Sequence, residues 1–137
     1  MADTIELEVV TPERQLVKES VTEAQIPARE GYIGVLPGHA PLLSLLGSGA
    51  LSYASPGGGR KVLAIHGGFV EVLPDHVRVL ANLAERAEEI NLEKARADLK
   101  QANERLASHD QAGATDPAVA LEESALAQAR ITAAEMK

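Results

Sequence analysis

Histidine and serine are the residues whose chemistry must be tested first, because the chain contains no cysteine. No two histidines have the i, i+4 spacing of a helical metal site, and none has an acidic partner at metal-ligand spacing; they are His39, His66, His76 and His109. No serine lies in a nucleophile elbow, and the acidic residues are distributed without a distinct acid/base pair. The sequence therefore predicts no catalytic residue and no metal site.

The glycine-rich segment from Pro56 to Lys61, PGGGRK, superficially resembles a phosphate-binding loop. Such a loop needs four residues between its first glycine and the Gly-Lys pair, followed by Ser or Thr and a helix. Here the strand-like sequence VLAI follows instead, so we predict a hairpin turn. The segment Gly47-Ser48-Gly49 likewise lacks the third glycine of a dinucleotide fingerprint.

Composition limits the classes of partner. Of 137 residues, 45% are apolar but only 2% are aromatic, so the core must be aliphatic. The net charge of -7 and the absence of a basic patch argue against a nucleic-acid partner. The lack of cysteine excludes disulfides and fits a reducing compartment. No signal peptide and no apolar run of about 20 residues is present, so we expect a cytosolic chain that meets a membrane only through a partner.

The chain divides into two parts with different hydrophobic periods. Residues 4–84 show alternation or short apolar runs broken by turn residues, as in Ile5, Leu7 and Val9. The runs 69–73 and 77–81 flank Pro74-Asp75-His76, which indicates a hairpin. Many short strands with close turns predict a small antiparallel sandwich or barrel. We assign residues 1–85 to this β domain and residues 86–137 to a helical hairpin.

The helical part has two amphipathic segments. The first has a narrow seam after the N-cap Asn91 and ends near His109; the seam comprises Leu92, Ala95, Leu99, Ala102 and Leu106. The second begins at Asp116-Pro117 and carries the stripe Ala118, Leu121, Ala125, Ala129 and Ala133. The two helices should pair antiparallel across a linker at 110–115. Because alanine buries little surface, the pairing should be weak enough for a competing surface to open the hairpin.

The segment from Glu30 to Leu43, EGYIGVLPGHAPLL, is stiff and apolar where a surface loop is usually polar. Its glycines allow positive φ or close backbone approach, and its prolines fix φ. Tyr32 adds an apolar ring with a polar tip, and His39 adds a hydrogen-bonding group. We interpret this segment as a preorganised contact surface, although Ile33, Val35 and Leu36 could simply close the end of the sandwich.

This segment, HGGFVEV followed by VRVLA, and the tail ending in AAEMK together resemble the epsilon subunit of F-type ATP synthases. The resemblance covers essentially the whole chain. It implies a β-sandwich of about ten strands followed by a two-helix hairpin. It also implies a non-catalytic rotor subunit that joins the gamma subunit to the c-ring. In that family the hairpin can rise toward the catalytic alpha/beta head and block ATP hydrolysis, so the resemblance implies a hairpin that could inhibit hydrolysis. The expected location is peripheral, on the cytoplasmic side of a bacterial plasma membrane.

The resemblance also assigns candidate site residues. The c-ring contact would involve Gly31, Tyr32, Gly34, Pro37 and His39. The family's nucleotide motif reads Ile or Leu, Asp, two free positions, Arg, Ala. Here the matching positions, with a cation from the second helix, are Ile90, Asn91, Lys94, Ala95 and Arg130.

This degenerate motif leaves two hypotheses open. Asn91 lacks the aspartate charge, and Lys94 lacks the planar fork with which arginine binds phosphate. We therefore expect weak or absent ATP binding and no cofactor. The chain could be a purely mechanical rotor subunit or also a nucleotide-sensing module. Only Arg130 and Lys137 of the second helix could meet an acidic catalytic surface, which weakens the case for inhibition.

Overall fold

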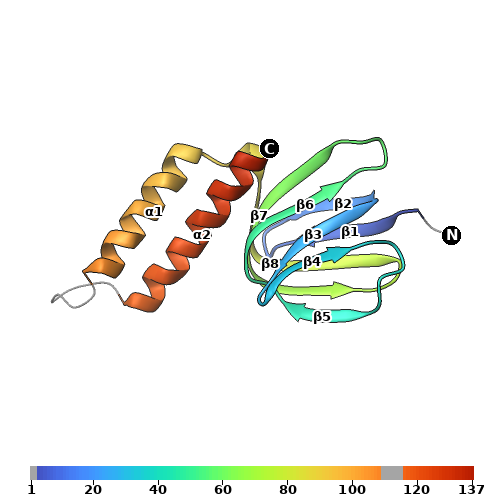
Figure 1. Ribbon diagram of the computed structural model, residues 1–137, viewed down its shortest axis with the longest axis horizontal. Helices are drawn as coiled ribbons and strands as arrows, with labels where there is room; N and C mark the ends of the chain where they lie inside the picture. Colours follow the sequence, from blue (N-terminus) through green and yellow to red (C-terminus); the bar gives the residue numbers. More distant parts are fainter. Residues whose placement is uncertain (1–2, 109–115) are drawn as a thin grey trace.

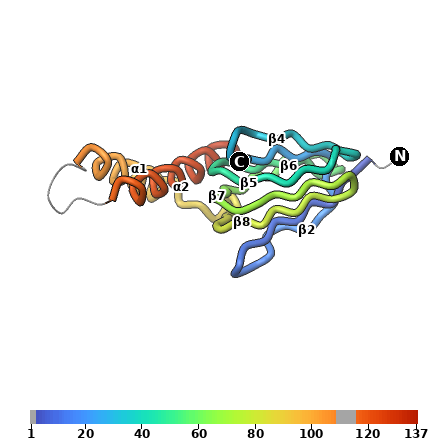
Figure 2. The backbone as a smooth tube through the Cα atoms, turned by 90° about the horizontal axis from the view of Figure 1, so that it is seen from below, coloured from blue at the N-terminus to red at the C-terminus, as the bar shows by residue number. Residues whose placement is uncertain are grey.

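A computed structural model describes residues 3–108 and 116–137 and shows a β-sandwich beside a two-helix hairpin (Figure 1 and Figure 2). The strands are β1 (Ile5–Val10), β2 (Gln15–Val21), β3 (Glu23–Ala28), β4 (Gly31–Val35), β5 (Leu42–Leu45), β6 (Ser48–Ala54), β7 (Arg60–Val72) and β8 (His76–Arg86). A short 3-10 turn, η1 (Ala87–Glu89), leads into helices α1 (Leu92–Ala107) and α2 (Pro117–Met136). The predicted fold class is confirmed.

One sheet folds over on itself to make the sandwich. Its strand order is β2-β1-β8-β7-β6-β3-β4, and β5 pairs with β7. The pairing of β1 with β8 is parallel, and the other strand pairs are antiparallel. Along β1, Ile5, Leu7 and Val9 are buried between the layers while Glu6 is exposed. The alternation seen in the sequence therefore predicts which face of β1 forms the core.

The described residues form eight strands, fewer than the ten or so that the resemblance implied. The difference arises because β7 and β8 are long and continuous. β7 pairs with β6 over Arg60–His66 and with β5 over Phe69–Val72. Between these two parts, Gly67 and Gly68 have φ values of 70° and 112°, which glycine adopts without steric cost. Counting each of the two long strands as two would restore the expected number.

The hairpin begins as the sequence predicts. The Asn91 side chain accepts a hydrogen bond from the Lys94 amide at 3.1 Å, and Asp116 accepts one from the Ala118 amide at 2.9 Å. The helices run antiparallel, with an ion pair between Arg96 and Glu135 at 3.3 Å. His109 and the expected linker at 110–115 lie outside the described residues.

The predicted stripe on α2 is partly wrong. Ala118 and Leu121 are exposed, whereas Ala129 and Ala133 are buried. The reason is that α2 lies between α1 and the outer face of the sandwich, so it buries two faces (Figure 1). Its buried residues are Ala120, Ala127, Ala129, Ile131, Ala133 and Ala134. A single stripe cannot describe a helix that has partners on two sides.

Candidate functional site

The five candidate c-ring residues are spread along β4 and the loop that follows it. Gly31, Tyr32 and Gly34 are exposed on the strand, whereas Pro37 and His39 are half-buried in the loop beyond its far end. At roughly 3.3 Å per strand residue, Tyr32 and His39 lie at opposite ends of this segment. The sequence placed them on one continuous segment but did not show this separation.

Tyr32 combines an exposed ring with a fixed hydroxyl. Tyr32 as a whole is 57% exposed. The hydroxyl oxygen nevertheless accepts a hydrogen bond from the Ala50 amide at 3.0 Å. A Cβ atom on Gly49 would lie 2.5 Å from that oxygen, so only glycine leaves room for it. The ring is therefore held in place by its polar tip while its apolar surface faces solvent.

Hydrogen bonds also hold the loop between β4 and β5. The Gly38 amide donates to the Pro74 carbonyl at 2.9 Å, and Gly38 has a φ of 85°. The His39 amide donates to Leu36 at 3.1 Å. The His39 Nδ1 lies 2.6 Å from the Ala40 carbonyl, so this nitrogen carries the proton. These bonds give the loop the preorganisation that its glycines and prolines suggested.

A row of large apolar side chains crosses the outer face of the sheet, which we call the apolar row. It consists of Leu45, Phe69 and Leu80, which are cross-strand partners on β5, β7 and β8. Their residues are 42%, 51% and 46% exposed. Contiguous exposed apolar side chains of this kind mark contact surfaces. Sequence reasoning missed this row, because neighbouring positions in it are 11 or more residues apart along the chain.

The residues of the degenerate nucleotide motif do come together. Ile90, Asn91, Lys94, Ala95 and Arg130 line one hollow of about 200 Å³ between η1, α1 and α2. Three acidic residues that the sequence reading did not select, Glu85, Glu89 and Asp98, share it. The i, i+4 spacing of Lys94 and Asp98 could have revealed one of them. No sequence pattern could have indicated Glu85, because its partner Arg130 is 45 residues away along the chain.

Both cations of this hollow are already paired. The Arg130 guanidinium donates to Glu85 at 2.5 Å, and the Lys94 ammonium donates to Asp98 at 3.1 Å. The hollow contains three carboxylates, because Glu89 adds to Glu85 and Asp98, against the two cations. Its net charge is therefore negative by one. A nucleotide phosphate would have to displace two carboxylates from their cations. The arrangement supports the expectation of weak ATP binding.

Glu89, the third carboxylate of this hollow, belongs to an ion pair that anchors the start of the hairpin. Its two carboxylate oxygens accept from the Arg14 guanidinium at 3.0 and 2.9 Å. It also accepts from the Arg86 amide at 3.0 Å. The hydrogen bond from Arg14, followed by that from Arg86, lowers the pKa of Glu89 to about 2. The β1–β2 turn is thereby tied to η1.

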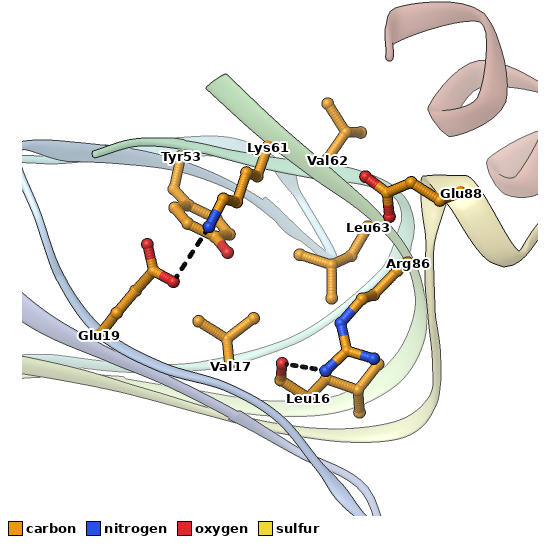
Figure 3. Close-up of a pocket in the computed structure, with 9 residues that line it drawn as sticks. All are labelled: Leu16, Val17, Glu19, Tyr53, Lys61, Val62, Leu63, Arg86 and Glu88. Atoms are coloured by element: carbon orange, nitrogen blue, oxygen red, sulfur yellow. Dashed lines mark hydrogen bonds and ion pairs between the residues drawn. The ribbon is translucent and has the colours of Figure 1, made fainter. Parts of the chain in front are cut away.

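A pocket of about 300 Å³ opens between β2 and the β6–β7 pair (Figure 3). Its charged groups are mostly paired: Lys61 with Glu19 at 3.4 Å, and Arg86 with the Leu16 carbonyl at 2.8 Å. Burial, and next the charge of Glu19, raise the pKa of Tyr53 to about 12. Its phenol therefore stays protonated at neutral pH and is unsuited to act as a base there.

Ser48, His66 and Glu122 form a row that resembles a hydrolase triad in residue type. The Ser48 hydroxyl contacts His66 Nδ1. However, His66 Nε2 is 4.0 Å from Glu122, beyond hydrogen-bond reach, and the Glu122 side chain is 78% exposed. Glu122 belongs to α2, so this row is a contact between the hairpin and the sandwich.

Within residues 3–108 and 116–137 no group of three potential metal ligands occurs. No helix there is long and apolar enough to span a membrane.

Comparisons with known proteins agree with this architecture. Residues 4–87 match the family described as ATP synthase, Delta/Epsilon chain, beta-sandwich domain. The ATP synthase epsilon chain of Solibacter usitatus is 56% identical over 137 residues, covering 100% of both chains. That of Carboxydothermus hydrogenoformans is 52% identical over 107 residues, covering 78% of this chain and 79% of the relative.

Two solved structures are also similar. A chain of the Euglena gracilis mitochondrial ATP synthase, solved as OSCP/F1/c-ring, has a TM-score of 0.76 at 28% identity, covering 93% of this chain and 78% of that chain. A chain of the Tetrahymena thermophila central stalk/c-ring structure has a TM-score of 0.60 at 14% identity, covering 95% and 96%, and shows the fold alone. Together with the family match, these comparisons show that the chain belongs to the ATP synthase delta/epsilon chain family.

Proposed function

We propose that this chain is the central-stalk subunit that joins the gamma subunit to the c-ring of an F-type ATP synthase. It is a non-catalytic member of the epsilon-chain family. The observation that carries the proposal is the end-to-end similarity to an epsilon chain at 56% identity. Assembled in this way, the chain is peripheral to the membrane, on the cytoplasmic side of a bacterial plasma membrane.

The apolar row is the proposed surface for the gamma subunit. Three exposed apolar side chains on adjacent strands offer a flat area, and sheet geometry fixes their spacing. A rotor contact must transmit torque, and a sheet face resists shear better than a flexible loop does. Burial of such a patch would stabilise the assembly by about 25 cal/mol for each Å² of apolar surface removed from water.

Co-purification tests this surface. Phe69→Glu places a charge at the centre of the apolar row, so the variant should no longer co-purify with the gamma subunit. Leu121→Glu changes a residue of similar exposure on the hairpin, 58% against 51%, and serves as the matched control. Retention of the Phe69→Glu variant in a stoichiometric complex would place the gamma contact elsewhere.

The segment from Gly31 to His39 is the proposed c-ring surface. Its support is the fixed, exposed Tyr32 ring and the hydrogen-bonded loop. Because the chain has no cysteine, Tyr32→Cys allows a specific cross-link to a cysteine in the polar loop of the c-subunit. Lys100→Cys, on exposed α1, is the control. A cross-link from position 32 to the alpha or beta subunits instead would refute this assignment.

A regulatory role of the hairpin is the second candidate function. Swung toward the alpha/beta head, the hairpin would inhibit ATP hydrolysis. The observation that favours a movable hairpin is its attachment through small side chains, including Ala133 and Ala134 of α2 against Ala50 and Ala64 of the sheet. Small side chains bury little surface, so the docked state is separated from an open one by a modest free energy.

A further inference from the structure

Tyr32 and the docking surface of α2 are connected through the first residues of β6. The β3–β6 ladder ends at the pair Gln25 and Ser52, so it does not reach Ala50. The Tyr32 hydroxyl accepts from the Ala50 amide where the ladder has ended. Ala50 is 2% exposed, and a buried amide without an acceptor is costly. The hydroxyl therefore stabilises the start of β6.

The segment Ser48–Ala50 is in turn linked to α2 in two ways, directly at Ala50 and indirectly through His66 of β7. The Ala50 side chain belongs to the buried cluster that contains Ala133 and Ala134 of α2. The Ser48 hydroxyl contacts His66, whose other ring nitrogen lies 4.0 Å from Glu122 of α2. A displacement of this segment therefore reaches the helix mainly through the packing of Ala50 against Ala133 and Ala134.

Gly49 makes the link stiff. An added Cβ would lie 2.5 Å from the Tyr32 hydroxyl oxygen and 2.9 Å from the Pro27 Cβ. The Tyr32 hydroxyl, Pro27 and the backbone of β6 are therefore in close contact, so a shift of the ring toward β6 presses on that strand.

We infer that the Tyr32 hydroxyl is a positioning group that sets how firmly α2 docks on the sandwich, so that contact at Tyr32 and docking of the hairpin are coupled. A partner that shifts the Tyr32 ring would loosen α2, and a partner that holds the ring would retain it. The identity of that partner rests on the proposed function. The coupling itself is a property of the isolated chain and is tested there.

Amide hydrogen exchange of the isolated full chain, followed by NMR, tests the coupling. Tyr32→Phe removes only the hydroxyl and keeps the ring. We expect exchange at Ala50 to accelerate about tenfold, which corresponds to about 1.4 kcal/mol. We expect amides 131–134 of α2 to accelerate by a factor of about three or more. Exchange at the amides of β1, which is separated from β6 by β8 and β7 in the sheet, should be unchanged.

Two further variants sharpen the test. Ser44→Ala removes a hydroxyl that donates only to the adjacent Leu45 carbonyl, and it should leave α2 unaffected. Gly49→Ala should accelerate the same α2 amides through its clash with the hydroxyl. The double variant Tyr32→Phe/Gly49→Ala should then show less than the combined effect of its two changes, because the closer of the two clashes, with the Tyr32 oxygen, is gone while that with Pro27 remains.

Three results would overturn the inference. An unchanged Ala50 amide would mean that the hydroxyl does not hold β6. Faster exchange at Ala50 with unchanged α2 amides would mean that the bond exists but is not transmitted. A uniform acceleration that includes β1 would mean that the hydroxyl supports global stability only. None of these results depends on whether Tyr32 contacts the c-ring, so the proposed function is judged separately by its cross-link.

Discussion

The ion pair between Arg14 and Glu89 should make the stability of the chain depend on pH in the acid range. A carboxylate whose pKa falls from 4.5 to about 2 on folding contributes stability that is complete above pH 4.5. That contribution is lost as the pH falls through the folded pKa. The full drop would correspond to roughly 3 kcal/mol. Because the two side chains are 41% and 38% exposed, solvent screening reduces the expected effect to about 1 kcal/mol.

Glu89→Gln tests this reasoning by urea unfolding between pH 2 and pH 7. The variant should be about 1 kcal/mol less stable than the parent at pH 7, and the difference should vanish near pH 2. Glu30→Gln is the control, because Glu30 is exposed in the short turn between β3 and β4. A difference that persists unchanged to pH 2 would show that Glu89 acts through packing or hydrogen bonding rather than through its charge.

Three other predictions follow from particular residues. Gly68→Ala should lower the free energy of unfolding, measured with urea, by more than about 2 kcal/mol, because the added Cβ would lie 2.0 Å from the Leu80 carbonyl oxygen. Gly57→Ala is the control and should leave the free energy of unfolding nearly unchanged, because its Cβ meets open space. Calorimetry should show weak or no ATP binding, and Glu85→Gln should tighten it by releasing Arg130; a micromolar dissociation constant for the parent chain would contradict the pairing argument. Truncation after Glu85 should preserve assembly with gamma and raise the ATPase activity of the complex if the hairpin inhibits; failure to assemble would show that the sandwich needs the hairpin.

The sequence alone determined the local features of this protein. Alternation in β1 predicted its buried face, and Asn91 and Asp116 predicted where the helices begin. These features depend on neighbours within a few residues, so the chain carries their signal directly. The division at residue 85 remains a prediction. In the structure, β8 ends at Arg86 and α1 begins at Leu92.

Only the tertiary structure decided which distant residues meet. It made β7 and β8 continuous through both layers, buried two faces of α2, and aligned Leu45, Phe69 and Leu80 across three strands. It also paired Arg130 with Glu85 and placed the Tyr32 hydroxyl against the Ala50 amide. Strand register and helix docking join positions that are separated by many residues. Packing of the whole chain determines these pairings, and no short stretch of sequence records them.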